Sequence, residues 1–153
     1  MTKKIFIGVC LFLCGSCQQT EQLYSDRELT QVLEKEFGTH SDTVDLTGID
    51  YFKWDQLVIL PPYSDVQKVG RELDLNFKII NQNFIKLSDS YNLLVFIKDD
   101  KVVKIAELSR NYADFSDEKQ IIKKADTRFI PSEDSKLYTL QSSLPKDDWE
   151  ISD

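Results

Sequence analysis

All of the cysteines of this 153-residue chain lie at or before position 17. They are Cys10, Cys14 and Cys17, and the rest of the chain, from Gln18 to Asp153, contains none. No disulfide can therefore cross-link the body of the chain, so its fold must be held together by a buried apolar core. The same distribution excludes a cysteine nucleophile and a cysteine metal site from that body.

The segment 1–16 has the layout of a secretory signal peptide. Lys3 and Lys4 give a positive start, residues 5–13 form an apolar run, and the small Gly15 and Ser16 follow it. A helix that spans a bilayer needs about 20 apolar residues, so this run is too short to be one. The alternatives are an ordinary signal peptide that is cut a little later, and an apolar helix that belongs to the core.

The end of this leader resembles the lipobox of bacterial lipoproteins. The matching segment is residues 13–17, Leu-Cys-Gly-Ser-Cys, in which Cys14 stands where an aliphatic or small residue is usual. The resemblance implies cleavage before Cys17 and acylation of its side chain. It also implies two or three acyl chains, which anchor stably where a single chain is marginal. Gln18 follows the cysteine, not Asp, and this favours the outer membrane in enteric-type envelopes.

The mature chain, from Cys17 to Asp153, has a length that suits one domain. We divide it into a short tether over residues 17–24, a folded domain over 25–144 and an acidic tail over 145–153. The tether spans at most about 25 Å, so we expect the domain close to the membrane. Loss of Lys3 and Lys4 from the 19 basic residues leaves 17 against 26 acidic ones, a net charge of −9. Such a surface disfavours nucleic acid and anionic lipid headgroups, because like charges repel.

A capping-box pattern predicts the first helix. Residues 25–28, Ser-Asp-Arg-Glu, place a side-chain acceptor at the N-cap with a glutamate three residues later. Tyr24 and Leu29 occupy the two positions of a hydrophobic staple, and Gly38 supplies the stop. The apolar residues recur at helical spacing and predict one buried face: Leu29, Val32, Leu33 and Phe37.

Two further helices follow from weaker patterns. Ser64 and Gln67 repeat the capping-box pattern at the start of the second helix. A third candidate runs from Asp117 through Ala125. The second helix has apolar residues spaced for one face: Val66, Val69 and Leu73.

Short alternating or apolar runs predict the strands, over residues 43–49, 56–60, 83–87, 91–97, 101–108, 127–130 and 137–140. The run 91–97 is almost continuously apolar, which predicts a central strand covered on both faces. Asp99 and Asp100 join it to 101–108 in the strongest hairpin of the chain. Helices followed by an antiparallel meander indicate an α+β fold, a single domain with two or three helices packed on the sheet.

The sequence carries no signature of a cofactor, a metal or a catalytic triad. His40 is the single histidine and lies in a predicted loop, which leaves zinc and Ser-His-Asp chemistry unsupported. Glycines are too few for a phosphate-binding loop. The acidic cluster Asp114, Asp117 and Glu118 lacks the alternating spacing of a calcium loop, as does the pair at 147–148.

The most distinctive segment is residues 50–55, Asp-Tyr-Phe-Lys-Trp-Asp, followed by a short strand and residues 61–64, Pro-Pro-Tyr-Ser. It resembles small uncharacterised bacterial lipoproteins and secreted proteins with an aromatic-x-Trp-Asp motif, a strand and a Pro-Tyr pair that leads into a helix. The likeness covers roughly residues 45–73, and Pro61 stands where a smaller residue is usual. The resemblance implies a fold and no activity.

Two interpretations of this segment remain open. In the structural one, Trp54 and Tyr63 pack on the second helix and Asp55 caps a turn or accepts a hydrogen bond from an aromatic side chain. In the functional one, Tyr51, Trp54 and Tyr63 line an exposed pocket for a partner or ligand, since aromatic side chains are favoured at interfaces.

Two functions remain open as well. We expect a non-enzymatic lipoprotein, anchored to the membrane through Cys17, that acts as a protein-binding or accessory module of the cell envelope. An acidic module of this kind mates well with a basic partner. The alternative is a small envelope hydrolase that uses a pair of carboxylates on cell-wall or sugar substrates. A large concave pocket with converging acids favours the enzyme, and a flat acidic face favours the module.

Overall fold

The structure, a computed structural model, describes residues 22–39, 41–81, 84–132 and 136–143. Over these ranges the chain forms two α-helices and eight strands, which confirms the predicted α+β class. No helix within them is long and apolar enough to cross a bilayer. Cys17, His40 and the predicted tail at 145–153 lie outside the described residues.

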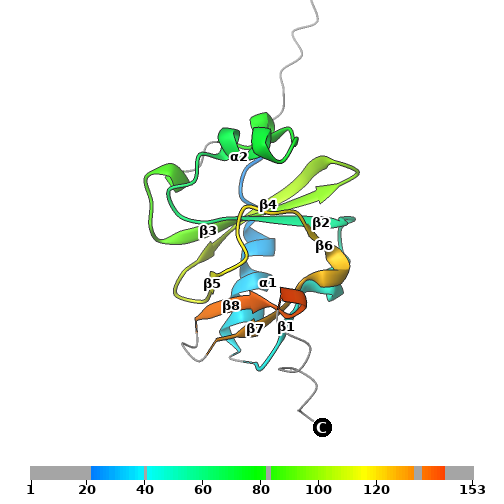
Figure 1. Cartoon of the computed structure of the whole chain (residues 1–153), viewed down its shortest axis with the longest axis vertical. Coiled ribbons are helices and arrows are strands. Elements are labelled where there is room, and N and C mark those ends of the chain that lie inside the picture. Colours follow the sequence, from blue (N-terminus) through cyan, green and yellow to red (C-terminus); the bar gives the residue numbers. More distant parts are fainter. Residues whose placement is uncertain (1–21, 40, 82–83, 133–135, 144–153) are drawn as a thin grey trace, which may run out of the picture.

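The strands pair into two four-stranded sheets (Figure 1). The first sheet has the order β4-β3-β2-β6, with β2 at Gln56–Leu60, β3 at Tyr91–Lys98, β4 at Lys101–Ser109 and β6 at Ile122–Lys123. The second has the order β1-β7-β8-β5, with β1 at Val44–Asp45, β7 at Arg128–Pro131, β8 at Leu137–Leu140 and β5 at Asp114–Phe115.

The expected single meander is therefore divided between two sheets, and one strand pair, β5 with β8, is parallel. The division begins directly after β4. The backbone N–H groups of Tyr112 and Ala113 both bond to the Ser109 carbonyl, at 2.9 and 3.4 Å. This turn ends β4 and directs the chain away from the first sheet to β5.

The predicted hairpin is confirmed. β3 and β4 are joined by two residues, Asp99 and Asp100, with positive φ values of 49° and 59°. Two left-handed residues in a two-residue loop match the right-handed twist of the strands, and aspartate tolerates this conformation better than most residues. As predicted, β3 is covered on both faces: its six inner residues are all buried.

Each α-helix begins one residue later than the capping boxes predict. Helix α1, Arg27–Gly38, is capped by Asp26, which accepts the Leu29 N–H at 2.9 Å. Helix α2, Val66–Glu72, is capped by Asp65, which accepts the Lys68 N–H at 3.0 Å.

The two serines serve other contacts. The Ser25 hydroxyl accepts the Glu107 N–H, and the Ser64 hydroxyl donates to the Pro61 carbonyl. An ionised aspartate is the stronger acceptor at the positive end of a helix, which explains the shift of both caps. With the cap at Asp26, Tyr24 no longer holds the staple position, and its side chain is exposed.

Three predicted elements are wrong in type or length. The strand predicted at 83–87 is a 3₁₀ helix, η3 at Phe84–Lys86. The helix predicted at 117–125 is replaced by β6 and η4, Lys124–Asp126. The strand predicted at 43–49 is shortened to β1, because η1 at Leu46–Gly48 follows at once. All three patterns were short, and tertiary pairing overrides so weak a local preference.

The first sheet separates two hydrophobic cores. Along β2, Leu57 and Ile59 point to one core and Val58 and Leu60 to the other, as side chains alternate along a strand. In Figure 1, α2 lies above this sheet, and α1 with the second sheet lies below it.

We call the lower core the aromatic core. It contains the predicted buried face of α1 and six buried aromatic side chains: Phe37, Trp54, Phe96, Phe115, Phe129 and Tyr138. We call the upper core the aliphatic core. Its single buried aromatic residue among those described is Phe77, in η2 at Phe77–Ile79, and α2 contributes Val66 and Val69.

Residues 23–26, which we call the edge segment, cover the middle of β4. The Leu23 N–H bonds to the Ile79 carbonyl at 2.7 Å, and the Asn81 N–H bonds to the Leu23 carbonyl at 2.8 Å. Ser25 then forms a parallel bridge with Ile105, whose carbonyl accepts the Asp26 N–H at 2.8 Å. The chain thus passes from the aliphatic side, over the edge of the sheet, into α1.

Candidate functional site

Trp54 belongs to the aromatic core. Its side chain is only 4% exposed, and its indole N–H donates to the Ile49 carbonyl at 2.8 Å. The ring meets Phe96 edge-on at 5.0 Å between centroids, and the Lys124 ammonium lies 4.7 Å from the Trp54 ring centroid. Trp54 therefore does not line an exposed pocket and does not pack on α2. It is a core residue with a satisfied polar end.

Asp55 ties the start of β2 to the β3–β4 turn. Its carboxylate accepts the Lys98 ammonium at 2.9 Å and the Asp99 N–H at 3.4 Å. The hydrogen bond from Lys98, with the smaller contributions of the Asp99 N–H and of the Lys98 charge, holds the pKa of Asp55 below its ordinary value. Its other oxygen, Oδ1, is buried without a partner among the described residues. This is a structural ion pair that fixes the turn.

Tyr51 and Tyr63 are both exposed, but they lie at opposite ends of β2. Tyr51 stacks edge-on against Phe52, with 5.1 Å between centroids. Tyr63 follows the strand, and its N–H bonds to the Ile85 carbonyl at 2.8 Å. A five-residue strand of roughly 17 Å separates them, so the four residues Tyr51, Trp54, Asp55 and Tyr63 do not form one site.

The acidic cluster near β5 is occupied by internal contacts. Asp114 pairs with Arg110. Asp117 accepts the Leu140 N–H and the Ser143 hydroxyl, each at 2.9 Å. Within the part of the chain that the structure describes, no group of three His, Cys, Asp or Glu side chains is placed to hold a metal ion.

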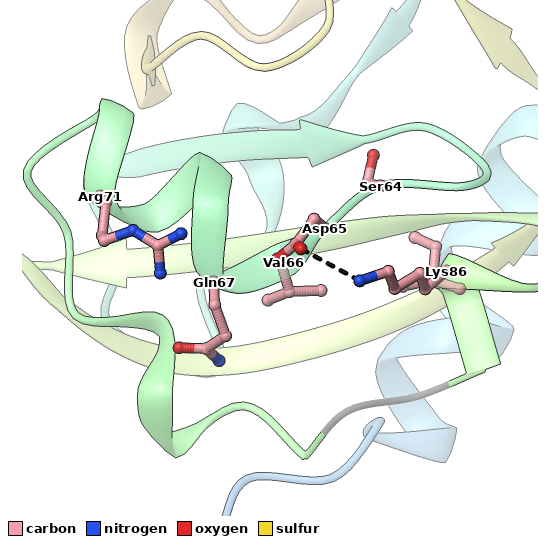
Figure 2. A pocket seen from close by; sticks show the side chains of 7 residues that line it. Ser64, Asp65, Val66, Gln67, Arg71 and Lys86 are labelled. Atoms are coloured by element: carbon pink, nitrogen blue, oxygen red, sulfur yellow. Dashed lines mark hydrogen bonds and ion pairs between the residues drawn. The ribbon is translucent and has the colours of Figure 1, made fainter.

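A small pocket lies beside α2 (Figure 2), with a volume of about 220 Å³. Its polar side chains other than Arg71 already have partners. Asp65 pairs with Lys86 at 3.2 Å, drawn as the dashed line, and the Gln67 amide donates to the Phe77 carbonyl at 2.9 Å. Ligand pockets usually measure about 300–1,000 Å³, so this hollow is too small for most ligands.

A larger hollow, of about 450 Å³, lies where α1 passes the end of β4. We call it the edge groove. It opens broadly to solvent and is lined mainly by polar side chains: Ser25, Arg27, Thr30, Glu34, Ser90, Tyr91, Glu107 and Ser109. The edge segment determines where the edge groove lies. It covers β4 at Ile105, and the last residues of β4 are left beside the groove.

Glu107 is the most unusual residue of the edge groove. It is half-buried, and this burial raises the pKa of its carboxyl above the ordinary value. No hydrogen bond or ion pair reaches this carboxylate from the other described residues. The backbone is nevertheless fixed, because the Glu107 N–H bonds to the Ser25 hydroxyl at 3.0 Å. A partly buried carboxylate without a protein partner and with a raised pKa marks a candidate binding or catalytic site.

Tyr91 lies beside Glu107 on the same face of the sheet. Tyr91 pairs with Ser109, and Leu93 with Glu107, so the two side chains are diagonal neighbours. Burial, with the negative charge of Glu107 as a second cause, raises the pKa of Tyr91 to about 12. Its hydroxyl therefore stays protonated at neutral pH and is available as a hydrogen-bond donor.

Sequence reasoning missed this groove, because its two sides are far apart in the chain. Ser25 and Glu107 meet only through the edge segment. One local signal was present. Glu107 is two residues after Ile105 in β4, so its side chain points to the same face of the sheet as that of Ile105, which is buried in the aliphatic core. An acidic residue at an inward-facing strand position is uncommon and has to be explained.

Comparison with protein-family models, with curated proteins and with solved structures gave no match for this chain.

Proposed function

We propose that this protein is a membrane-anchored bacterial lipoprotein that acts as a non-enzymatic, protein-binding or accessory module of the cell envelope, held at the outer membrane by lipid on Cys17. The leader and its lipobox-like end support the anchor. The edge segment supports a close attachment, because Leu23 is already bonded into the domain. At most about 21 Å of extended chain then separates Cys17 from the folded domain.

The edge groove is the binding site in this proposal, and the partnerless carboxylate of Glu107 is the observation that carries it. A cation offsets the cost of a half-buried carboxylate. β4 is the edge strand of its sheet, and although the Glu107 N–H and the Ser109 carbonyl are already bonded, the remaining outward backbone groups can meet an extended chain, a common mode of peptide recognition. The proposed occupant is therefore an extended segment of a partner protein that places a Lys or Arg side chain against Glu107.

The acidic surface suits such a partner. The mature chain has a net charge of −9, which speeds encounter with a basic protein and disfavours acidic competitors. The Tyr91 hydroxyl and the serine hydroxyls of the groove supply donors and acceptors for the backbone of the occupant.

One observation favours the alternative, a small envelope hydrolase. Glu34 and Glu107 both line the edge groove, and a carboxyl with a raised pKa is suited to act as a general acid. The broad opening of the groove favours binding over hydrolysis, because it leaves a reacting sugar open to bulk water.

The test is site-specific cross-linking in cells. A photo-cross-linking side chain at Ser109 should capture one protein reproducibly, through a peptide that contains Lys or Arg. Glu107→Gln keeps the shape and removes the charge, so it should reduce capture about 30-fold or more, from the roughly 2–5 kcal/mol lost when one member of a buried charge pair is removed. Glu72→Gln, on the exposed surface of α2, is the matched control and should leave capture unchanged.

Three results would argue otherwise. Capture that survives Glu107→Gln would remove the groove from the proposal. Release of soluble glycan from cell walls, abolished by both Glu34→Gln and Glu107→Gln, would favour the hydrolase. The mass of the mature amino-terminal peptide, compared with that of Cys17→Ser, tests the anchor separately: an unmodified Cys17 would contradict the lipoprotein assignment.

A further inference from the structure

The two most exposed large apolar side chains among the described residues lie together in η3 and the turn after it. Phe84 is 80% exposed and Leu87 is 79% exposed. The turn at Tyr63, which is 63% exposed, is fixed against η3 by the bond from the Tyr63 N–H to the Ile85 carbonyl. We call Tyr63, Phe84 and Leu87 the η3 patch. Three neighbouring apolar side chains at such exposure indicate a surface that another phase or molecule covers.

The segment that contains the η3 patch, residues 63–87, differs in net charge from the rest of the chain. Residues 63–87 carry four basic side chains, Lys68, Arg71, Lys78 and Lys86, against three acidic ones, Asp65, Glu72 and Asp74. This segment therefore has a net charge of +1, whereas the mature chain as a whole has −9. The acidic surface that disfavours anionic lipid headgroups thus belongs to the remainder of the chain.

The amino-terminal chain enters the domain beside the η3 patch. Leu23 is bonded to Ile79 and Asn81, and Asn81 is three residues before Phe84. Three residues span at most about 11 Å, and Cys17 is at most about 21 Å of extended chain from Leu23. A lipid on Cys17 therefore leaves the η3 patch within reach of the bilayer surface.

We propose that the η3 patch docks on the surface of the bilayer that holds the lipid anchor, with its aromatic and aliphatic side chains among the headgroups. This inference rests on the proposed acylation of Cys17. Aromatic and leucine side chains beside Lys and Arg are the composition that binds at the membrane interface, and the basic residues are attracted to lipid phosphates. The acidic remainder, including the second sheet, then faces away from the membrane.

The first experiment maps which end touches lipid. A single environment-sensitive fluorophore is attached at Leu87→Cys or, as the matched control, at Leu137→Cys, which is exposed on β8 in the second sheet. The acylated full-length protein is placed in vesicles of phosphatidylethanolamine and phosphatidylglycerol in a 3:1 ratio. A quencher is carried in the headgroup region. The label at 87 should shift to the blue and lose fluorescence to the quencher, whereas the label at 137 should keep its aqueous spectrum.

The possible results distinguish docking through the η3 patch from anchoring through Cys17. In one case the protein floats with the vesicles while neither label responds, or while both labels respond equally. Either result overturns docking through the η3 patch and leaves the anchor in place. If the protein does not float, the anchor fails and the docking falls with it. If the label at 87 is already shifted without vesicles, in proportion to protein concentration, a second copy covers the patch and the membrane does not.

A second measurement needs no lipid anchor. The Cys17→Ser protein should bind the same vesicles weakly, and Phe84→Ala with Leu87→Ala should lower that affinity about tenfold, the effect expected from removing two partly inserted apolar side chains. The pair Ile121→Ala and Leu137→Ala, also exposed, should leave it unchanged. Equal loss in both pairs would contradict a specific docking surface.

Discussion

The two faces of the first sheet are covered in different ways. The aromatic core joins segments from both ends of the described domain, from Leu29 in α1 to Leu140 in β8. The aliphatic core is built mainly from residues 58–105. Phe37 contacts three aromatic rings, those of Phe115, Phe129 and Tyr138, at 4.9 to 5.9 Å between centroids. Phe77, on the other face, contacts no aromatic ring among the described residues.

This difference indicates a division of roles. The aromatic core is held by long-range aromatic contacts, so we expect it to contribute more to the global free energy of unfolding. The opposite face is closed by a seven-residue helix and short 3₁₀ turns, with Phe84 and Leu87 left exposed. Elements with few buried contacts open locally at lower free energy. We therefore expect the aliphatic side to open locally more easily than the aromatic side.

The largest expected effect tests this division in the two cores. Phe37→Ala should lower the free energy of unfolding by about 3–5 kcal/mol, the range for buried phenylalanine. Phe77→Ala should lower the free energy of unfolding by less than Phe37→Ala does, with a difference of about 1 kcal/mol or more. The reason is that Phe77 loses no aromatic pair, and each such pair contributes about 0.5–1.5 kcal/mol. Urea denaturation measures both. Equal losses would show that the two cores contribute alike.

Hydrogen exchange distinguishes local opening of one core from opening of the whole domain. Phe77→Ala should raise exchange mainly in α2 and η2, whereas Phe37→Ala should raise it throughout the two sheets. A uniform increase in the Phe77 variant would contradict local opening of the aliphatic side.

A smaller effect is expected at a glycine of α2. A methyl group on Gly70 would lie 2.9 Å from the Leu75 carbonyl oxygen and 2.9 Å from the Phe77 side chain. The carbonyl cannot retreat freely, because the Leu75 N–H bonds to the Gly70 carbonyl at 2.8 Å. Gly70→Ala should therefore destabilise by about 1–3 kcal/mol, although alanine gains roughly 1 kcal/mol in helix propensity.

Gly48→Ala is the control for this prediction, since no atom lies within 4 Å of the added methyl group. It should leave the thermal midpoint nearly unchanged. A stabilised Gly70→Ala protein would mean that the turn between α2 and η2 yields easily, and the aliphatic face would then be softer than the packing indicates.

The smallest effect compares the two helix caps and depends on pH. Burial opposes ionisation of Asp26, but the hydrogen bonds from Leu29 and Lys104 outweigh it and keep the pKa of Asp26 below its ordinary value. Its contribution to stability is therefore present above the unfolded pKa of about 3.9 and is lost as the pH falls through the lower folded pKa. Asp26→Ala should cost about 1 kcal/mol at pH 7, the usual cost of losing a cap.

The charge-removing variant separates the cap from the ion pair. Asp26→Asn retains a capping oxygen, so it should cost less than alanine at pH 7, and its deficit should shrink as the pH falls below about 4. Asp65→Ala, at the exposed cap of α2, should have a smaller effect on unfolding in urea. A deficit of Asp26→Asn that stays constant with pH would contradict a role for the Asp26 charge.

Local signals in the sequence predicted the elements that local interactions determine. The helical spacing from Leu29 to Phe37 placed the buried face of α1, and the run before Asp99 placed β3 and its hairpin. The strands β2 and β8 were also predicted at their observed positions. These elements depend on periodicity and turn chemistry within a few residues of each other.

Contacts between distant segments could not be predicted in this way. The strands β5 and β6 have two residues each and exist only because β8 and β2 are present to pair with them. Trp54 packs against Phe96, and the Glu107 backbone is bonded to Ser25, in each case across a long stretch of chain. Of the two interpretations left open for Tyr51, Trp54 and Tyr63, a shared exposed pocket does not fit the burial of Trp54. The motif alone does not show which of its aromatic residues are buried in the core.

The edge segment and β4 are synthesised at different times, and this affects when the edge of the sheet is covered. Ser25 is made long before Ile105, the neighbour that it bridges in β4. The edge segment therefore cannot pair with β4 until β4 has been synthesised. Closing so long a loop adds little to the entropic cost, because that cost grows only slowly with loop length. Until the edge segment closes over it, the newly formed β4 presents an open edge on which a second nascent chain can add a strand. Removal of residues 23–26 would recreate that open edge in the finished protein, so amino-terminal trimming that reaches α1 should promote strand addition between copies of the domain.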